Sequence, residues 1–155
     1  RSGSKKTPMK ILVDADACPV KEIIVKHAKT CRLPVVMLLD TSHILNDGYS
    51  TVITVDKGHD SADLRLANLL EAGDLVVTQD FGVAALALGK RARAINQNGM
   101  IYNDSNMDQL LFERHLGQKV RRAGGRTTGA KKRTRQDDVD FERAFVRLLQ
   151  EMGNE

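Results

Sequence analysis

Two carboxylates stand close together directly after a short apolar run near the start of the chain. The stretch "VDADACPV" covers residues 13–20 and places Asp14 and Asp16 two positions apart. Two acids this close repel each other, so each raises the pKa of the other unless a cation neutralises them. Carboxylate oxygens are the ligands that Mg²⁺ and Mn²⁺ prefer. We therefore expect these two residues to help hold one of these divalent ions.

Further aspartates follow later apolar runs. Asp60 and Asp63 lie in "KGHDSADL", at the beginning of a predicted helix, and Asp80 ends the run "DLVVTQD". Acids are also common in a first helical turn, where they cap free N–H groups and complement the helix dipole. Carboxylates that converge on one crevice are better explained by a shared cation. The predicted metal ligands are Asp14, Asp60 and Asp80, with Asp16 and Asp63 as helpers.

A hydroxyl group accompanies the last of these acids. Thr78 lies two residues before Asp80, and so on the same side of a strand. Its hydroxyl can orient a carboxylate or a metal-bound water. A bound divalent ion lowers the pKa of water and stabilises charge on a phosphoryl oxygen. The predicted reaction is hydrolysis of a phosphodiester, with Asp14, Thr78 and Asp80 as catalytic residues.

Apolar runs and helical patterns alternate along the chain, and these elements must position the acids. Five runs suit buried strands, at residues 10–14, 34–40, 50–56, 74–80 and 92–96. Helical spacing of apolar residues marks 18–31, 60–73, 81–90, 106–116 and a last helix that contains Phe141, Phe145 and Leu148. Near-continuous apolar strands that alternate with helices predict an α/β sandwich on a mostly parallel sheet. Sites in such folds form at the carboxyl ends of the strands, where these acids fall.

The length and composition favour one domain without a membrane span. The chain has 155 residues, of which 41% are hydrophobic. We expect the domain to cover residues 9–152, with residues 1–8 a tag remnant or a disordered leader. No apolar run approaches the roughly 20 residues that a membrane span needs. With two cysteines and no secretory signal, we expect a cytoplasmic protein with reduced thiols.

A basic segment follows the fourth predicted helix. Residues 119–135 contain eight Lys or Arg and no acid. Such a segment is either a solvated loop or a binding surface for a polyanion, most simply nucleic acid. We expect a flexible loop at about 118–136 that binds single-stranded RNA with little sequence preference, because the chain has few aromatic residues for stacking. The predicted phosphate ligands are Arg121, Arg122, Arg126, Lys131, Lys132 and Arg133.

Two further residues have simple structural interpretations. Cys18 follows the first acids, and a small buried side chain is its expected role, with redox sensitivity as the alternative. His27 falls on the apolar face of the first predicted helix. A partly buried histidine with a hydrogen-bond partner is expected there.

Four motifs together resemble the YaiI/YqxD family of bacterial proteins: "VDADACPV", "KGHDSADL", "VVTQD" and "RRAGGRTTGAKKRTRQDD". The resemblance runs from about Met9 to about Gln150. It implies a single PIN-like three-layer sandwich, with a mostly parallel central sheet and helices on both faces. PIN-like proteins are typically Mg²⁺- or Mn²⁺-dependent nucleases that act on RNA, and the stretch around Asp60 and Asp80 is similar to their NYN branch. Their further acid after the fourth strand is missing here, and Asp16 is the candidate substitute.

Two other functions fit parts of the pattern. A haloacid-dehalogenase-type phosphatase uses D-x-D after its first strand, with Asp14 as nucleophile and Asp16 as general acid. Its cap insertion and its late acidic motif are missing, which ranks it below the nuclease. A non-catalytic nucleic-acid-binding module on the same fold is the third possibility. The sequence does not determine the oligomeric state.

Overall fold

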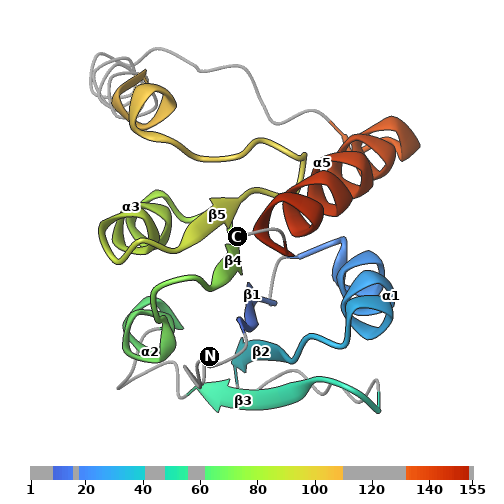
Figure 1. Ribbon diagram of the computed structural model, residues 1–155, viewed down its shortest axis with the longest axis horizontal. Helices are drawn as coiled ribbons and strands as arrows, with labels where there is room; N and C mark the ends of the chain where they lie inside the picture. The colour runs from blue at the N-terminus through green and yellow to red at the C-terminus, as the bar shows by residue number, and fades with distance from the viewer. Residues whose placement is uncertain (1–8, 16–17, 41–47, 56–61, 110–131, 154–155) are drawn as a thin grey trace.

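The computed structural model describes residues 9–15, 18–40, 48–55, 62–109 and 132–153 (Figure 1). The strands are β1 (Ile11–Asp14), β2 (Val35–Asp40), β3 (Thr51–Val55), β4 (Leu75–Val77) and β5 (Arg93–Ile95). The helices are α1 (Lys21–Cys31), α2 (Ala62–Leu69), α3 (Phe81–Gly89) and α5 (Arg135–Gly153). Residues 104–109 are helical as well.

The five strands form one sheet in the order β3-β2-β1-β4-β5, and every pair of neighbouring strands is parallel. Helices α1 and α5 cover one face of the sheet, and α2 and α3 cover the other (Figure 1). The predicted α/β sandwich with helices on both faces is therefore confirmed. Because β1 is the central strand, its carboxyl end lies in the middle of one edge of the sheet.

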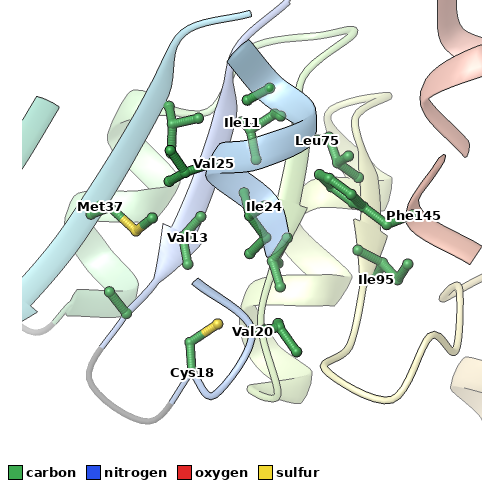
Figure 2. Close-up of a cluster of buried hydrophobic side chains, with 14 of the residues drawn as sticks. Ile11, Val13, Cys18, Val20, Ile24, Val25, Met37, Leu75, Ile95 and Phe145 are labelled. Atoms are coloured by element: carbon green, nitrogen blue, oxygen red, sulfur yellow. The ribbon is translucent and has the colours of Figure 1, made fainter. Parts of the chain in front are cut away.

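Alternate residues of each strand enter two separate apolar cores. Ile11 and Val13 of β1 pack toward α1 and α5, whereas Leu12 packs toward α2 and α3. Figure 2 shows Ile11, Val13 and Ile24 together with Phe145 of α5 in the first of these cores. Ile11, Leu12 and Val13 are completely buried, which explains why β1 is continuously apolar up to Asp14.

Several element boundaries differ from the sequence prediction. Helix α1 begins at Lys21 rather than at residue 18, because Val20 has non-helical backbone angles and Pro19 lies in a turn ahead of it. Strand β4 ends at Val77 instead of Asp80. The helix predicted at 106–116 begins at residue 104, because Asn103 and Asn106 cap its start through reciprocal hydrogen bonds. Its predicted end lies outside the described residues.

Helix α5 is fixed to α1 by a polar contact at the rim of the core. Nε2 of His27 lies 2.7 Å from Oε2 of Glu142, and Nζ of Lys26 donates to the same oxygen at 3.2 Å. The His27 ring also meets the ring of Phe145 edge to face. The prediction of a partly buried, hydrogen-bonded histidine at this position is confirmed. No helix among the described residues has the length and apolar content that crossing a membrane would require.

This contact predicts a pH dependence of stability. Hydrogen bonds from His27 and then Lys26 lower the pKa of Glu142 below its ordinary value of 4.5. A lowered pKa stabilises the fold above the ordinary value, and this contribution disappears as the pH falls through the lowered pKa. We expect Glu142→Gln to lower the free energy of unfolding at pH 7 by about 0.2–1 kcal/mol, because the pair is partly exposed. Urea unfolding at decreasing pH should show that the difference in unfolding free energy between the wild type and the variant becomes smaller below pH 4.5. A constant difference would indicate a packing effect.

A buried aspartate ties the sheet together at the edge opposite the predicted site. Asp74 is 3% exposed and accepts hydrogen bonds from three donors. These are the backbone N–H of Lys10 at 3.1 Å, the Lys10 ammonium group at 2.7 Å and the backbone N–H of Glu71 at 2.8 Å. The carboxylate therefore joins the start of β1 to the turn that precedes β4.

We expect Asp74→Asn to destabilise the protein, because one carboxylate oxygen becomes an N–H group that faces donors. The loss should be about 2–4 kcal/mol in the free energy of urea unfolding. Asp108→Asn is a matched control at an exposed position, and it should change that free energy by less than about 0.5 kcal/mol. Equal effects of the two substitutions would contradict the structural role of Asp74.

Candidate functional site

The pairing of β1 with β4 brings two predicted site residues to the same point. Val13 and Val77 are register partners in this parallel pair. Asp14 is the last residue of β1 and Thr78 directly follows β4, so they lie side by side at the carboxyl edge. The chain leaves β1 toward β2 on one side and returns to β4 on the other. Such a reversal of strand order opens a crevice between the loops, and this crevice is the usual ligand site of open α/β sheets.

A small pocket of about 40 Å³ lies at this crevice. Its residues come from the ends of β1 and β4 and from the segments after β1 and β5. They are Asp14, Cys18, Val77, Thr78, Gln79 and Gln97. The volume exceeds what one water molecule needs. Asp14 and Thr78 were predicted as site residues, whereas Gln79 and Gln97 were missed.

Asp80 is held in place by the first turn of α3. Its Oδ1 accepts a hydrogen bond from the backbone N–H of Val83 at 3.1 Å, which makes Asp80 the N-cap of the helix. Its own backbone N–H donates to the Thr78 hydroxyl at 2.9 Å. The Thr78 hydroxyl therefore fixes the Asp80 backbone. The second carboxylate oxygen has capacity for a further partner.

Tyr102 stabilises the Thr78 backbone and was not predicted as a site residue. It is 5% exposed, and its hydroxyl donates to the Thr78 carbonyl at 3.2 Å. Burial raises the pKa of Tyr102, and the negative charge of Asp80 raises it further. The hydroxyl therefore keeps its proton and remains a donor. Only the turn after β5 brings Tyr102 here, so no local sequence signal could have identified it.

Cys18 lines the pocket but belongs to the apolar core. Its side chain is 8% exposed and packs in the same core as Val13 and Val20 (Figure 2). Burial raises the pKa of the Cys18 thiol, although the backbone N–H of Val20 and the charge of Lys21 act in the opposite direction. A protonated, buried thiol is a poor nucleophile. The expected packing role of Cys18 is confirmed.

Two cations lie near the pocket. The ammonium group of Lys21 donates to the carbonyl of Ala15 at 3.1 Å, just past the end of β1. The guanidinium of Arg133 donates to a carboxylate oxygen of Asp138 and to Oδ1 of Asn98, and it also binds the carbonyl of Gln97 at 2.8 Å. Arg133 therefore fastens the end of the basic segment to the loop after β5. Lys132, beside it, is exposed.

The remaining predicted site residues are only partly described. Asp63 lies in α2, and its side chain is outside the description. Within the described part of the chain, no three His, Cys, Asp or Glu side chains form a group that could hold a metal ion. Outside the described residues lie Asp16, Asp60, Arg121, Arg122, Arg126 and Lys131.

Mg²⁺ commonly uses one or two carboxylates, with waters and substrate phosphates as its other ligands. Asp14 supplies such an oxygen donor at the pocket, and Asp80, which does not line the pocket, supplies another two residues after Thr78.

We expect Tyr102→Phe to weaken the support of the crevice. The substitution removes one hydroxyl and leaves the buried Thr78 carbonyl without its donor. The free energy of unfolding should fall by about 1 kcal/mol, as measured by urea denaturation at neutral pH. An unchanged value would mean that the Thr78 carbonyl finds another donor.

Comparisons with known proteins agree with one another. Residues 12–151 match the model of the family described as "Uncharacterized BCR, YaiI/YqxD family". A UPF0178 protein of Ruminiclostridium cellulolyticum is 63% identical over 141 residues, which make up 91% of this chain and 92% of the relative. UPF0178 proteins of Alkaliphilus oremlandii and Exiguobacterium sibiricum are 54% and 49% identical, and the matches cover 92% of this chain in both cases and 92% and 98% of the relatives. No solved structure matches the chain.

Proposed function

The chain belongs to the YaiI/YqxD family, and on this premise we propose that it is a metal-dependent nuclease that hydrolyses phosphodiester bonds of single-stranded RNA. The observation that carries the proposal is the position of Asp14. It lines a pocket between the carboxyl ends of β1 and β4, the central strands at which the strand order reverses. A carboxylate at this point of an open α/β sheet is well placed to act on a ligand.

The surrounding groups are suited to a phosphodiester. Asp14 and Asp80 would hold Mg²⁺ or Mn²⁺, with Asp16, Asp60 and Asp63 as further candidate ligands. Such an ion, when bound, supplies an activated water and neutralises charge on the phosphate. Lys21 and, at the described end of the basic segment, Arg133 add positive charge beside the pocket, which attracts a polyanion.

Thr78 acts through Asp80 in this proposal. Its hydroxyl accepts a hydrogen bond from the Asp80 backbone at 2.9 Å and thereby restricts the start of α3. The carboxylate is further restrained by its capping bond to Val83. A site whose charged groups are held in advance loses little free energy in reorganisation when charge develops. Thr78 is thus a positioning residue.

The proposal is tested by incubating the full chain with labelled single-stranded RNA and Mn²⁺ or Mg²⁺, beside a chelator control. Asp14→Asn and Asp80→Asn should each lower the rate by about 10²–10³-fold. Asn also caps helices well, so Asp80→Asn should keep the fold. Asp108→Asn, at an exposed position, should keep the wild-type rate.

Three outcomes would contradict the nuclease. Cleavage that persists in the chelator or in both site variants would indicate a contaminant. RNA binding without cleavage would favour the non-catalytic binding module. If neither is observed, phosphomonoester substrates would test the phosphatase alternative, in which Asp14 is the nucleophile.

A further inference from the structure

A second and larger pocket adjoins the one at Asp14. Its volume is about 300 Å³, and Gln79 and Gln97 line both pockets. The rest of its wall is formed by Phe81, Asn96, Asn98, Met100 and Tyr102. This volume lies at the lower end of the range found for small-molecule sites. A group bound here would therefore be the direct neighbour of a group bound at Asp14.

Three of the four amide side chains of this pocket, those of residues 96, 97 and 98, accept hydrogen bonds from protein donors at their oxygen atoms. Oδ1 of Asn96 accepts from the backbone N–H groups of Asn98 and Met100, each at 2.9 Å. Oε1 of Gln97 accepts from the side-chain amide of Gln79. Oδ1 of Asn98 accepts from the guanidinium of Arg133 at 2.7 Å. The amide groups of residues 96, 97 and 98 are thus oriented, and what they offer a ligand is N–H groups.

These N–H groups are neutral donors in a pocket with apolar walls. None of the described residues that line the pocket is charged. Phe81 and Met100 are only partly buried, so a ring and a thioether remain accessible to a flat ligand. Unpaired bases of RNA are bound in this way, by stacking on aromatic side chains and by hydrogen bonds to their edges. Neutral donors complement carbonyl acceptors, whereas they repel the amino group of cytosine or adenine.

We propose that this pocket is a base subsite that selects uracil over cytosine in the nucleotide adjoining the phosphate at Asp14. The inference rests on the proposed action on RNA and specifies its substrate further. Phe81 contacts the face of the base, and the amides of Gln97 and Asn98 donate to its carbonyl oxygens. The basic segment is expected to bind RNA with little sequence preference, so the base preference is confined to one nucleotide.

Uridine and cytidine oligonucleotides provide the test, because their bases have the same size. Labelled pentauridylate and pentacytidylate are titrated with the full chain in chelator, which prevents hydrolysis, and binding is measured by fluorescence anisotropy. The wild type should bind the uridine oligonucleotide about tenfold more tightly, as expected for one base-edge recognition pair.

Two variants replace donors by acceptors at nearly constant shape. Gln97→Glu keeps the oxygen that binds Gln79, and Asn98→Asp keeps the oxygen that binds Arg133. Each should reduce the uridine-to-cytidine affinity ratio toward one. Gln150→Glu adds the same charge at an exposed position of α5, so it should leave the ratio unchanged. The ratio also corrects for any general repulsion of RNA by the new charge.

Several results would overturn the subsite: equal affinities in the wild type, an unchanged ratio in both variants, or no binding of either oligonucleotide. The cleavage assay with metal reports on the proposed function separately. Cleavage without base preference would leave the nuclease intact and remove the subsite. A preference without cleavage would retain the subsite in a protein that binds RNA and does not hydrolyse it.

Discussion

The parallel pairing of β1 with both β2 and β4 is the constraint on which the rest of the structure depends. Because β1 is the middle strand, its backbone must be paired on both sides and its side chains buried on both faces. Helices must then cover both faces of the sheet. Parallel strands also require crossover connections, so the loops after β1 and β4 diverge at the carboxyl edge. The pocket beside Asp14 is a direct consequence of this topology.

Hydrogen bonds to the backbone hold the polar groups at this edge in position. Their positions therefore do not rest on electrostatic interactions between the side chains alone. Thr78 binds the Asp80 backbone through its hydroxyl and receives the Tyr102 hydroxyl at its carbonyl. These bonds connect β4, the first turn of α3 and the segment after β5. A carboxylate on such a support keeps its position without a ligand, which is favourable for a site that must bind charged groups.

Arg133 connects the last part of the chain to the same region. The helix that follows it begins with a capping box, in which Thr134 and Asp137 exchange hydrogen bonds at 2.9 and 3.3 Å. Arg133 itself binds Gln97 and Asn98 in the loop after β5. The end of the basic segment therefore lies next to the two pockets. The guanidinium of Arg133 is already hydrogen-bonded in this contact. Phosphate binding by Arg133 stays a prediction.

The sequence by itself determined the alternation of strands and helices and the position of Asp14 at the end of the first strand. Both follow from local information, because apolar periodicity and strand ends are properties of short segments. Asp80 was predicted at the end of the fourth strand, directly before a helix at 81–90, and the structure places it at the N-cap of α3. Its assignment to a strand was wrong at the last residues, since the cap formed with Val83 ends the strand earlier.

Only the tertiary structure decided which other residues meet these acids. Tyr102, Gln97 and Arg133 come from segments far from Asp14 in sequence, and the β4–β5 pairing and the fastening of α5 bring them to the edge. The residue types of Tyr102 and Gln97 are unremarkable where they stand in the chain, and Arg133 was predicted only as a phosphate ligand of the basic segment. Side-chain hydrogen bonds between distant segments leave no periodic pattern in a sequence. For that reason the carboxylates could be predicted, whereas the amide-lined pocket beside them could not.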